Sequence, residues 1–116
     1  MAATECLFCK IVAKEIQSEM VYEDEGFVVI KDINPAAPIH LLLIPKVHIA
    51  SLNEATIEDL DILGNLQLLA ARMAVLAGIA GQGYRLVNNV GKWGGQTINH
   101  LHYHLLGGKQ LGWPPE

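Results

Sequence analysis

Three histidines alternate with apolar residues near the end of this sequence, in residues 99–106. In a β-strand, side chains alternate between the two faces, so we expect His100, His102 and His104 on one face and the apolar residues between them on the other. Same-face neighbours lie about 6.5–7 Å apart, which lets three imidazoles converge on one small anionic group but is stretched for three ligands of one metal ion. The spacing therefore favours an anionic substrate. The alternative is a solvated strand without chemistry.

The middle histidine, His102, is the natural nucleophile of this set, because its two neighbours would flank the atom that it attacks. Imidazole is substantially neutral near pH 7, so it attacks without a separate strong base and can leave again. This chemistry predicts a two-step reaction through a covalent histidine intermediate.

A glycine-rich loop, residues 90–96, leads directly into the histidine run. Glycine lets backbone amides approach an anion closely, and the Gln96 amide and the Thr97 hydroxyl add neutral donors. Most glycine-rich loops are ordinary turns, so the prediction of an anion site depends on the neighbouring imidazoles.

Two polar residues accompany the central apolar strands. Asp32 follows one strand, where its carboxylate can accept hydrogen bonds from two sugar hydroxyls while Ile30 and Ile33 wall an apolar slot. As an isolated feature, Asp32 is more typical of a turn residue before Asn34 and Pro35. His40 begins the next strand, and a histidine satisfied by structural hydrogen bonds is the alternative to a catalytic one.

Composition limits the class of protein. At 116 residues and 51% hydrophobic composition, the chain predicts one domain over residues 1–116. The net charge of −4 gives no field that would hold DNA or RNA, although a single nucleotide is compatible with it. No stretch of about 18 apolar residues and no basic-apolar leader occurs, so we expect a cytoplasmic protein without a membrane partner.

Cys6 and Cys9 are too closely spaced to staple a fold. In a reducing compartment, such a C-x-x-C pair is typical of a metal site or of a redox pair. The spacing alone leaves both interpretations open.

Hydrophobic periodicity predicts the order of the elements. We expect a short helix at 7–14, a hairpin of strands at 21–22 and 27–33, a buried strand at 40–44, a long helix from 56 to 80 stopped by Gly81, and strands at 84–88 and 97–106. Thr56 and Asp59 resemble a capping box with Asp in place of Glu. Apolar residues occupy more than one face of the long helix, which favours contact with a second subunit.

The order His-apolar-His-apolar-His-apolar-apolar resembles the signature of the histidine triad (HIT) superfamily of nucleotide hydrolases and transferases. Residues 32–35 and 38–49 are similar to the family's strands, 94–97 to its phosphate loop, and 111–115 to the ending of the nucleoside phosphoramidase branch, the Hint proteins. This resemblance covers nearly the whole chain. It implies an α+β, HIT-like fold, with an antiparallel sheet of about five strands, one short and one long helix, and a homodimer.

The resemblance also implies roles for individual residues. His102 would be the nucleophile, with His104 and His40 near the phosphate and leaving group and His100 supporting the array. Asp32 and Ile33 would bind the nucleoside, and the α-phosphate and leaving group would be surrounded by Asn89, Gly95, Gln96 and Thr97.

The implied reaction is hydrolysis of the P–N bond of purine nucleoside phosphoramidates, of the adenosine 5′-monophosphoramidate type. It passes through a nucleotidyl-histidine, releases a nucleoside monophosphate and an amine, and requires no cofactor. Purine preference comes from the resemblance alone. The alternatives are a dinucleoside polyphosphate hydrolase of the same superfamily and a nucleotide-binding regulatory protein with negligible turnover.

In related galactose-1-phosphate uridylyltransferases and some HIT proteins, a quartet of cysteines and histidines holds zinc. Here Cys6, Cys9, His48 and His100 are the candidates for a structural zinc site. At the other end of the chain we expect Trp113 to dock against protein, because its large indole gains more there than in water. In the Hint branch this tail lies near the active site across the dimer.

Overall fold

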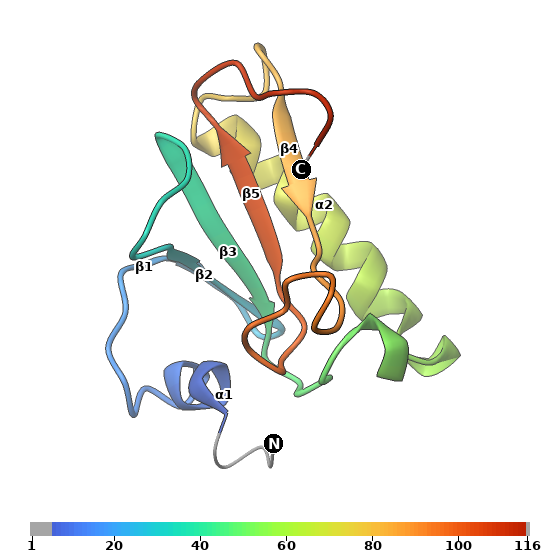
Figure 1. Cartoon of the computed structure of the whole chain (residues 1–116). Helices are drawn as coiled ribbons and strands as arrows, with labels where there is room; N and C mark the ends of the chain where they lie inside the picture. The colour runs from blue at the N-terminus through green and yellow to red at the C-terminus, as the bar shows by residue number, and fades with distance from the viewer. Residues whose placement is uncertain (1–5, 116) are drawn as a thin grey trace.

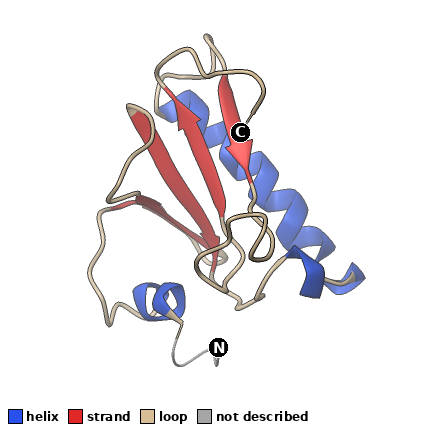
Figure 2. Cartoon of the chain, in the orientation of Figure 1, coloured by secondary structure: helices blue, strands red, loops and turns tan. Residues whose placement is uncertain are grey.

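The computed structural model describes residues 6–115, which form a five-stranded antiparallel sheet in the order β1-β2-β3-β5-β4 (Figure 1). The strands are β1 (Met20–Glu23), β2 (Phe27–Lys31), β3 (Ile39–Pro45), β4 (Tyr84–Val87) and β5 (Tyr103–Gly107). Two α-helices accompany them, α1 (Leu7–Val12) and α2 (Leu60–Leu76) (Figure 2). The predicted α+β fold with one short and one long helix is confirmed.

The sheet is buried on both faces, which explains the continuous apolar run of β3. On the α2 face, Leu41 and Leu43 pack with Leu105 and with the buried side of α2. On the opposite face, which we call the α1 face, Leu42 and Ile44 pack with Phe8 and Ile11 of α1. Each residue of β3 therefore faces one of two hydrophobic clusters, and His40 shares the α1 face with Leu42 and Ile44.

The long helix begins as predicted but ends earlier. Thr56 and Asp59 form a reciprocal capping box on a 3₁₀ turn, η3 (Ile57–Asp59), which leads into α2. The helix stops at Leu76 and not near Gly81, because Gly78 adopts a φ of +77°. The N–H groups of Gly78 and Ile79 then donate to the carbonyls of Val75 and Ala74, a Schellman motif that turns Ile79 into the core.

The histidine strand is shorter than expected. It pairs with its neighbours only over Tyr103–Gly107, so His100 and His102 precede it, and the prediction of a strand at 97–106 is wrong. The alternation nevertheless continues through the unpaired segment, because Leu101 and Tyr103 pack in the cluster on the α2 face. The histidines lie on the α1 face as predicted, although only His104 belongs to the ladder.

Within residues 6–115, no helix has both the length and the apolar character needed to cross a membrane. The predicted lack of a leader concerns residues 1–5, which lie outside the described part of the chain.

Candidate active site and metal centre

His102 is held as a neutral imidazole with one free nitrogen. Its Nδ1 lies 2.7 Å from the carbonyl oxygen of His100, and because a carbonyl only accepts, Nδ1 carries the hydrogen and Nε2 keeps its lone pair. Burial lowers the pKa of His102, which keeps the ring uncharged at neutral pH. Asn88 Nδ2 donates to the His102 carbonyl at 2.9 Å, and the edge of Phe8 packs on the ring at a centroid distance of 4.9 Å. These contacts leave Nε2 as the ring nitrogen with a free lone pair.

His40 of β3 and His104 of β5 form a pair of imidazoles across the ladder between these two strands. The backbone N–H of Ala36 donates to His40 Nδ1 at 3.0 Å, so that nitrogen is unprotonated and the hydrogen sits on Nε2. His40 Nε2 lies 2.9 Å from His104 Nδ1 and therefore donates to it. Burial lowers the pKa of His104 to about 4, so the neutral ring carries its hydrogen on Nε2. His104 thus offers a hydrogen-bond donor beside His102, whose ring centroid is 5.2 Å away.

Asp32 joins this pair through its carboxylate, since Oδ2 lies 3.4 Å from His40 Nε2. Asp32, His40 and His104 are close enough for a three-ligand metal site. However, the Ala36 contact leaves His40 Nε2 protonated, and a protonated nitrogen has no lone pair for a metal. This cluster is therefore a hydrogen-bonded chain.

Side-chain amides hydrogen-bond to the backbone of the loop at 90–96 and to the segments beside it. Asn89 Nδ2 donates to the Gly94 carbonyl at 2.7 Å, and Gln96 Oε1 accepts the Gly91 N–H at 3.0 Å. Gln96 Nε2 donates to the carbonyls of Ala50 and Ile98, so its amide shapes the loop from within. A Cβ on Gly94 would collide with the Val90 carbonyl, and no other residue fits there. The N–H groups of Gly91, Gly95 and Gln96 donate within the loop, so only its other backbone N–H groups remain for an anion.

The remaining predicted substrate residues stand at the surface. Ile33 is 92% exposed, and Thr97 and Gly95 are also exposed. The structure brings His40, His102, His104 and Asp32 together by direct contacts. Ile33, Gly95 and Thr97 lie on open surface instead.

Cys6, Cys9, His48 and His100 converge as the candidate metal centre, with all ligand atoms within 4.8 Å of one another. The two Nδ1 atoms are 3.1 Å apart, Cys9 Sγ lies 3.2 Å from His48 Nδ1, and Cys6 Sγ lies 3.3 Å from His100 Nδ1. Around tetrahedral zinc, with bonds of about 2.0–2.3 Å, neighbouring ligand atoms are about 3.3–3.8 Å apart. The cluster has nearly the size of a tetrahedral zinc shell.

The protonation of this cluster also suits a metal. His100 Nε2 donates to the Pro45 carbonyl at 2.8 Å, which fixes the tautomer that leaves Nδ1 bare for a ligand bond. Burial lowers the pKa of His100 to about 4, so the ring is neutral. Burial, together with Cys6, raises the pKa of the Cys9 thiol to about 11. A zinc ion would bind both sulfurs as thiolates and thereby connect α1 to the segments after β3 and before β5.

Four of the residues that hold the histidines in place were not predicted from the sequence. Phe8 and Pro45 act through ring packing and a carbonyl, neither of which leaves a signal in residue type. The Ala36 N–H is a backbone group of an irregular segment. Asn88 could have been suspected, because it stands beside Asn89 directly after a strand.

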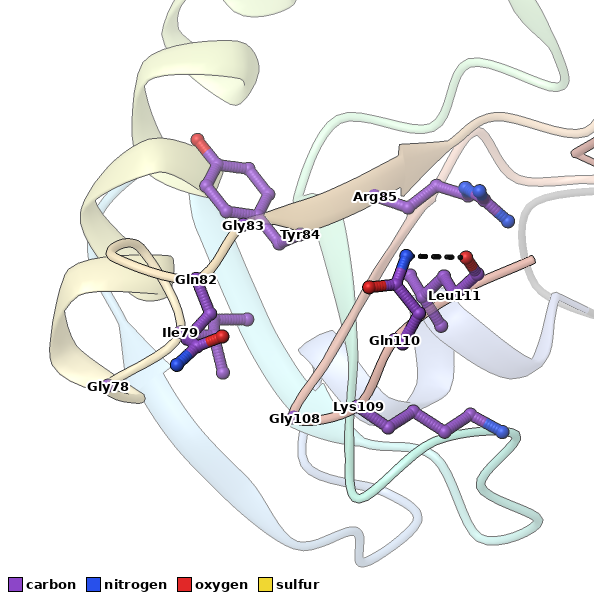
Figure 3. A pocket seen from close by; sticks show the side chains of 10 residues that line it. All are labelled: Gly78, Ile79, Gln82, Gly83, Tyr84, Arg85, Gly108, Lys109, Gln110 and Leu111. Atoms are coloured by element: carbon purple, nitrogen blue, oxygen red, sulfur yellow. Dashed lines mark hydrogen bonds between the residues drawn. The ribbon is translucent and has the colours of Figure 1, made fainter. Parts of the chain in front are cut away.

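A separate cavity of about 580 Å³ lies between the segment after α2, the start of β4 and the segment after β5, and no histidine lines it (Figure 3). Arg85 and Lys109 bring positive charge to it. Arg85 Nη2 also donates to the Gly112 carbonyl at 2.6 Å, so it holds the C-terminal segment. The lining offers no group of converging imidazoles or thiols, and the histidine cluster remains the candidate site.

Comparison with known proteins decides the family. Residues 5–112 match the family model described as "Scavenger mRNA decapping enzyme C-term binding". Protein HitA of Neisseria gonorrhoeae is 51% identical over 102 residues, which cover 88% of this chain and 94% of that protein. The chain belongs to the HIT family. The resemblance noted in the sequence is therefore confirmed.

This HIT protein is 44% identical over 110 residues to the purine nucleoside phosphoramidase of Escherichia coli (strain K12), covering 95% of the chain and 92% of that relative. The crystal structure of a HIT family hydrolase from Legionella pneumophila Philadelphia 1 matches it with a TM-score of 0.95 and 47% identity, covering 97% and 100% of the two chains. These relatives place the HIT protein among hydrolases.

The buried imidazoles predict a loss of stability in mild acid. The pKa of His104 is about 4 in the folded chain, against about 6.5 when unfolded, so the unfolded chain binds more protons between these values. The free energy of unfolding should fall as the pH drops from about 6.5 to about 4, by about 1 kcal/mol at pH 5 after discounting for solvent screening. Urea denaturation at about pH 6.5 and at pH 5 measures this loss of unfolding free energy. A folded His104→Gln variant whose stability declines equally steeply would contradict the assignment to His104.

Proposed function

We propose that this HIT protein hydrolyses the P–N bond of purine nucleoside phosphoramidates through a nucleotidyl intermediate on His102. The observation that carries the proposal is the 2.7 Å hydrogen bond from His102 Nδ1 to the His100 carbonyl, which leaves Nε2 neutral and free. The 44% identity to a protein named purine nucleoside phosphoramidase supports the choice of substrate class.

In the first step, His102 Nε2 attacks phosphorus and a new N–P bond forms while the P–N bond of the substrate breaks. The electron pair of the broken bond stays on the leaving nitrogen, which takes up a proton from solvent and departs as the amine. His104 Nε2–H and those backbone N–H groups of the loop at 90–96 that do not donate within the loop stabilise the charge on the phosphoryl oxygens. In the second step, water attacks the same phosphorus and gives up a proton to solvent, while the N–P bond to His102 breaks. The electron pair of that bond returns to Nε2, so His102 leaves as a neutral imidazole.

Asp32 and Ile33 are assigned to the nucleoside. The Asp32 carboxylate accepts hydrogen bonds from the ribose hydroxyls, and the exposed Ile33 offers an apolar surface to the base. Asn89 and Gln96 hold the phosphate loop in shape, while Gly95 and Thr97 lie at its open surface.

Side-by-side kinetics test the function. We expect adenosine 5′-phosphoramidate to give AMP and ammonia with a higher kcat/KM than a diadenosine polyphosphate gives. Intact-protein mass spectrometry after rapid acid quenching should show one AMP residue attached to the chain. Faster cleavage of the dinucleotide would favour the polyphosphate hydrolase, and AMP binding without any adduct would favour the regulatory protein.

We also propose that the Cys6–Cys9–His48–His100 cluster holds a structural zinc ion. The ligand spacing and the bare Nδ1 of His100 support it. Zinc would cross-link three segments of the chain, and every step of the reaction above is carried out by the histidines of the active site.

A homodimer is the third part of the proposal. Leu68, Val75 and Leu76 recur at helical spacing on α2 and are exposed, with Leu68 and Val75 at 70% and 65%. β4 is an edge strand beside this helix. Trp113 is 84% exposed, so the docking expected for its indole does not occur on its own chain, and a second subunit would have to supply it.

Sedimentation velocity checks the oligomeric state. At micromolar concentration we expect a dimer of the 12.7 kDa chain, and Val75→Glu should shift it to monomer by burying a charge in the interface. Val47→Glu is the matched control, because Val47 is 54% exposed but lies outside α2 and β4. A wild-type protein that sediments only as monomer would contradict the dimer.

A further inference from the structure

Asp32 contacts the imidazole pair that lies beside the nucleophile. Its backbone N–H donates to the His40 carbonyl at 3.0 Å, which continues the β2–β3 ladder and puts both side chains on the α1 face. Asp32 Oδ1 accepts the Asn34 N–H at 2.7 Å, while Oδ2 lies 3.4 Å from His40 Nε2. The local turn therefore holds the carboxylate with its second oxygen facing His40.

The hydrogen on His40 Nε2 lies near both of the other side chains. The Ala36 N–H occupies His40 Nδ1, so the hydrogen of the neutral ring is on Nε2. That N–H donates to His104 Nδ1 at 2.9 Å, and the Asp32 carboxylate oxygen Oδ2 lies 3.4 Å from the same nitrogen. The His40 side chain is only 7% exposed, so water competes weakly for this contact.

We propose that Asp32 is a positioning residue for the His40–His104 pair, independently of its contact with ribose. The charge of the carboxylate, 3.4 Å from His40 Nε2, adds to the Ala36 contact in keeping the hydrogen on that nitrogen. His104 Nδ1 then stays an acceptor, and His104 Nε2–H stays a donor for the phosphoryl group. This inference rests on the proposed function, because it deepens the role of the same site.

Sugar recognition and donor positioning are compatible at one carboxylate. A carboxylate offers about four lone-pair sites, and the Asn34 N–H uses one of them. The others remain for ribose hydroxyls. Asp32 therefore connects the presence of the sugar with the placement of the donor at phosphorus.

The substitution Asp32→Asn separates the two roles. It preserves the size of the side chain and the oxygen that accepts from Asn34, but it presents an NH₂ donor to the His40 N–H. Two substrates are compared, adenosine 5′-phosphoramidate and its 2′,3′-dideoxy analogue, which has no hydroxyls for Asp32 to bind. Asp32→Ala is the second variant, and it removes the acceptor without adding a donor.

With the dideoxy analogue, we expect kcat to fall about tenfold in Asp32→Asn, because the negative charge beside the His40 N–H is lost and an amide donor takes its place, and to fall less in Asp32→Ala. With the ribose substrate, both kcat and KM should change. A residue that only binds ribose has nothing to lose on the analogue, so wild-type kcat for both variants on that substrate would overturn the inference.

A spectroscopic readout works without turnover. Nitrogen-15 NMR of the histidine rings should show His40 and His104 protonated on Nε2 in the wild type, and Asp32→Asn should disturb both tautomers. Glu25→Gln, which removes one exposed carboxylate from the β1–β2 turn, should leave them unchanged. Absence of wild-type turnover would contradict the proposed function, whereas unchanged tautomers in Asp32→Asn would contradict this inference.

Discussion

His102→Ala is expected to abolish the nucleotidyl adduct and to lower kcat/KM for a nucleoside phosphoramidate by at least about 10⁴-fold, as removal of a nucleophile does in other covalent enzymes. The physical reason is that no other imidazole in the site can replace it. His104 Nδ1 accepts from His40, and the remaining nitrogen of His104 carries its hydrogen. His100 turns its free nitrogen toward the two cysteines.

Acid-quenched mass spectrometry and steady-state kinetics measure this effect. Tyr103→Phe is the matched control, because Tyr103 is next in the chain but packs in the cluster on the α2 face, and it should react as the wild type does. AMP binding by calorimetry should persist in His102→Ala, which separates lost chemistry from lost binding. An adduct that still forms in the alanine variant would assign the nucleophile to another residue.

Loss of the cysteine pair is expected to have the largest effect on stability. The purified wild type should contain about one zinc per chain, and Cys6→Ser with Cys9→Ser should remove the metal and lower the free energy of unfolding by several kcal/mol, since metal binding to a folded site contributes directly to folding. The loss should be large because the ligands come from α1, from the segment after β3 and from the segment before β5.

Elemental analysis and thermal denaturation test this prediction, with chelator-treated wild type for comparison. If zinc is the cause, chelation should destabilise the wild type but leave the double serine variant unaffected. Metal-free protein with an unchanged melting temperature would remove the zinc site from the proposal.

Local patterns in the sequence were sufficient for much of the fold. The period of two in the histidine run placed these rings opposite Leu101 and Leu105, because side-chain alternation depends only on an extended backbone. The capping box at Thr56 and Asp59 was likewise correct, since it is closed within four residues. The end of α2 was missed because Gly78 and Gly81 are equally good stops locally, and the burial of Ile79 decides between them.

The sequence predicted which side chains belong to the candidate site, but it did not predict the hydrogen bonds between them. The sequence by itself predicted His102 as the nucleophile and brought Cys6 and Cys9 together, because residue type and short spacing carry that information. The grouping of His100 with the cysteines came from the resemblance to the family, and the structure brings these side chains together. Only the tertiary structure decided that His40 donates to His104 and that Asp32 faces His40. Tautomers and donor directions depend on strand register and on backbone groups such as the Ala36 N–H, which segments distant in the chain bring together only after folding.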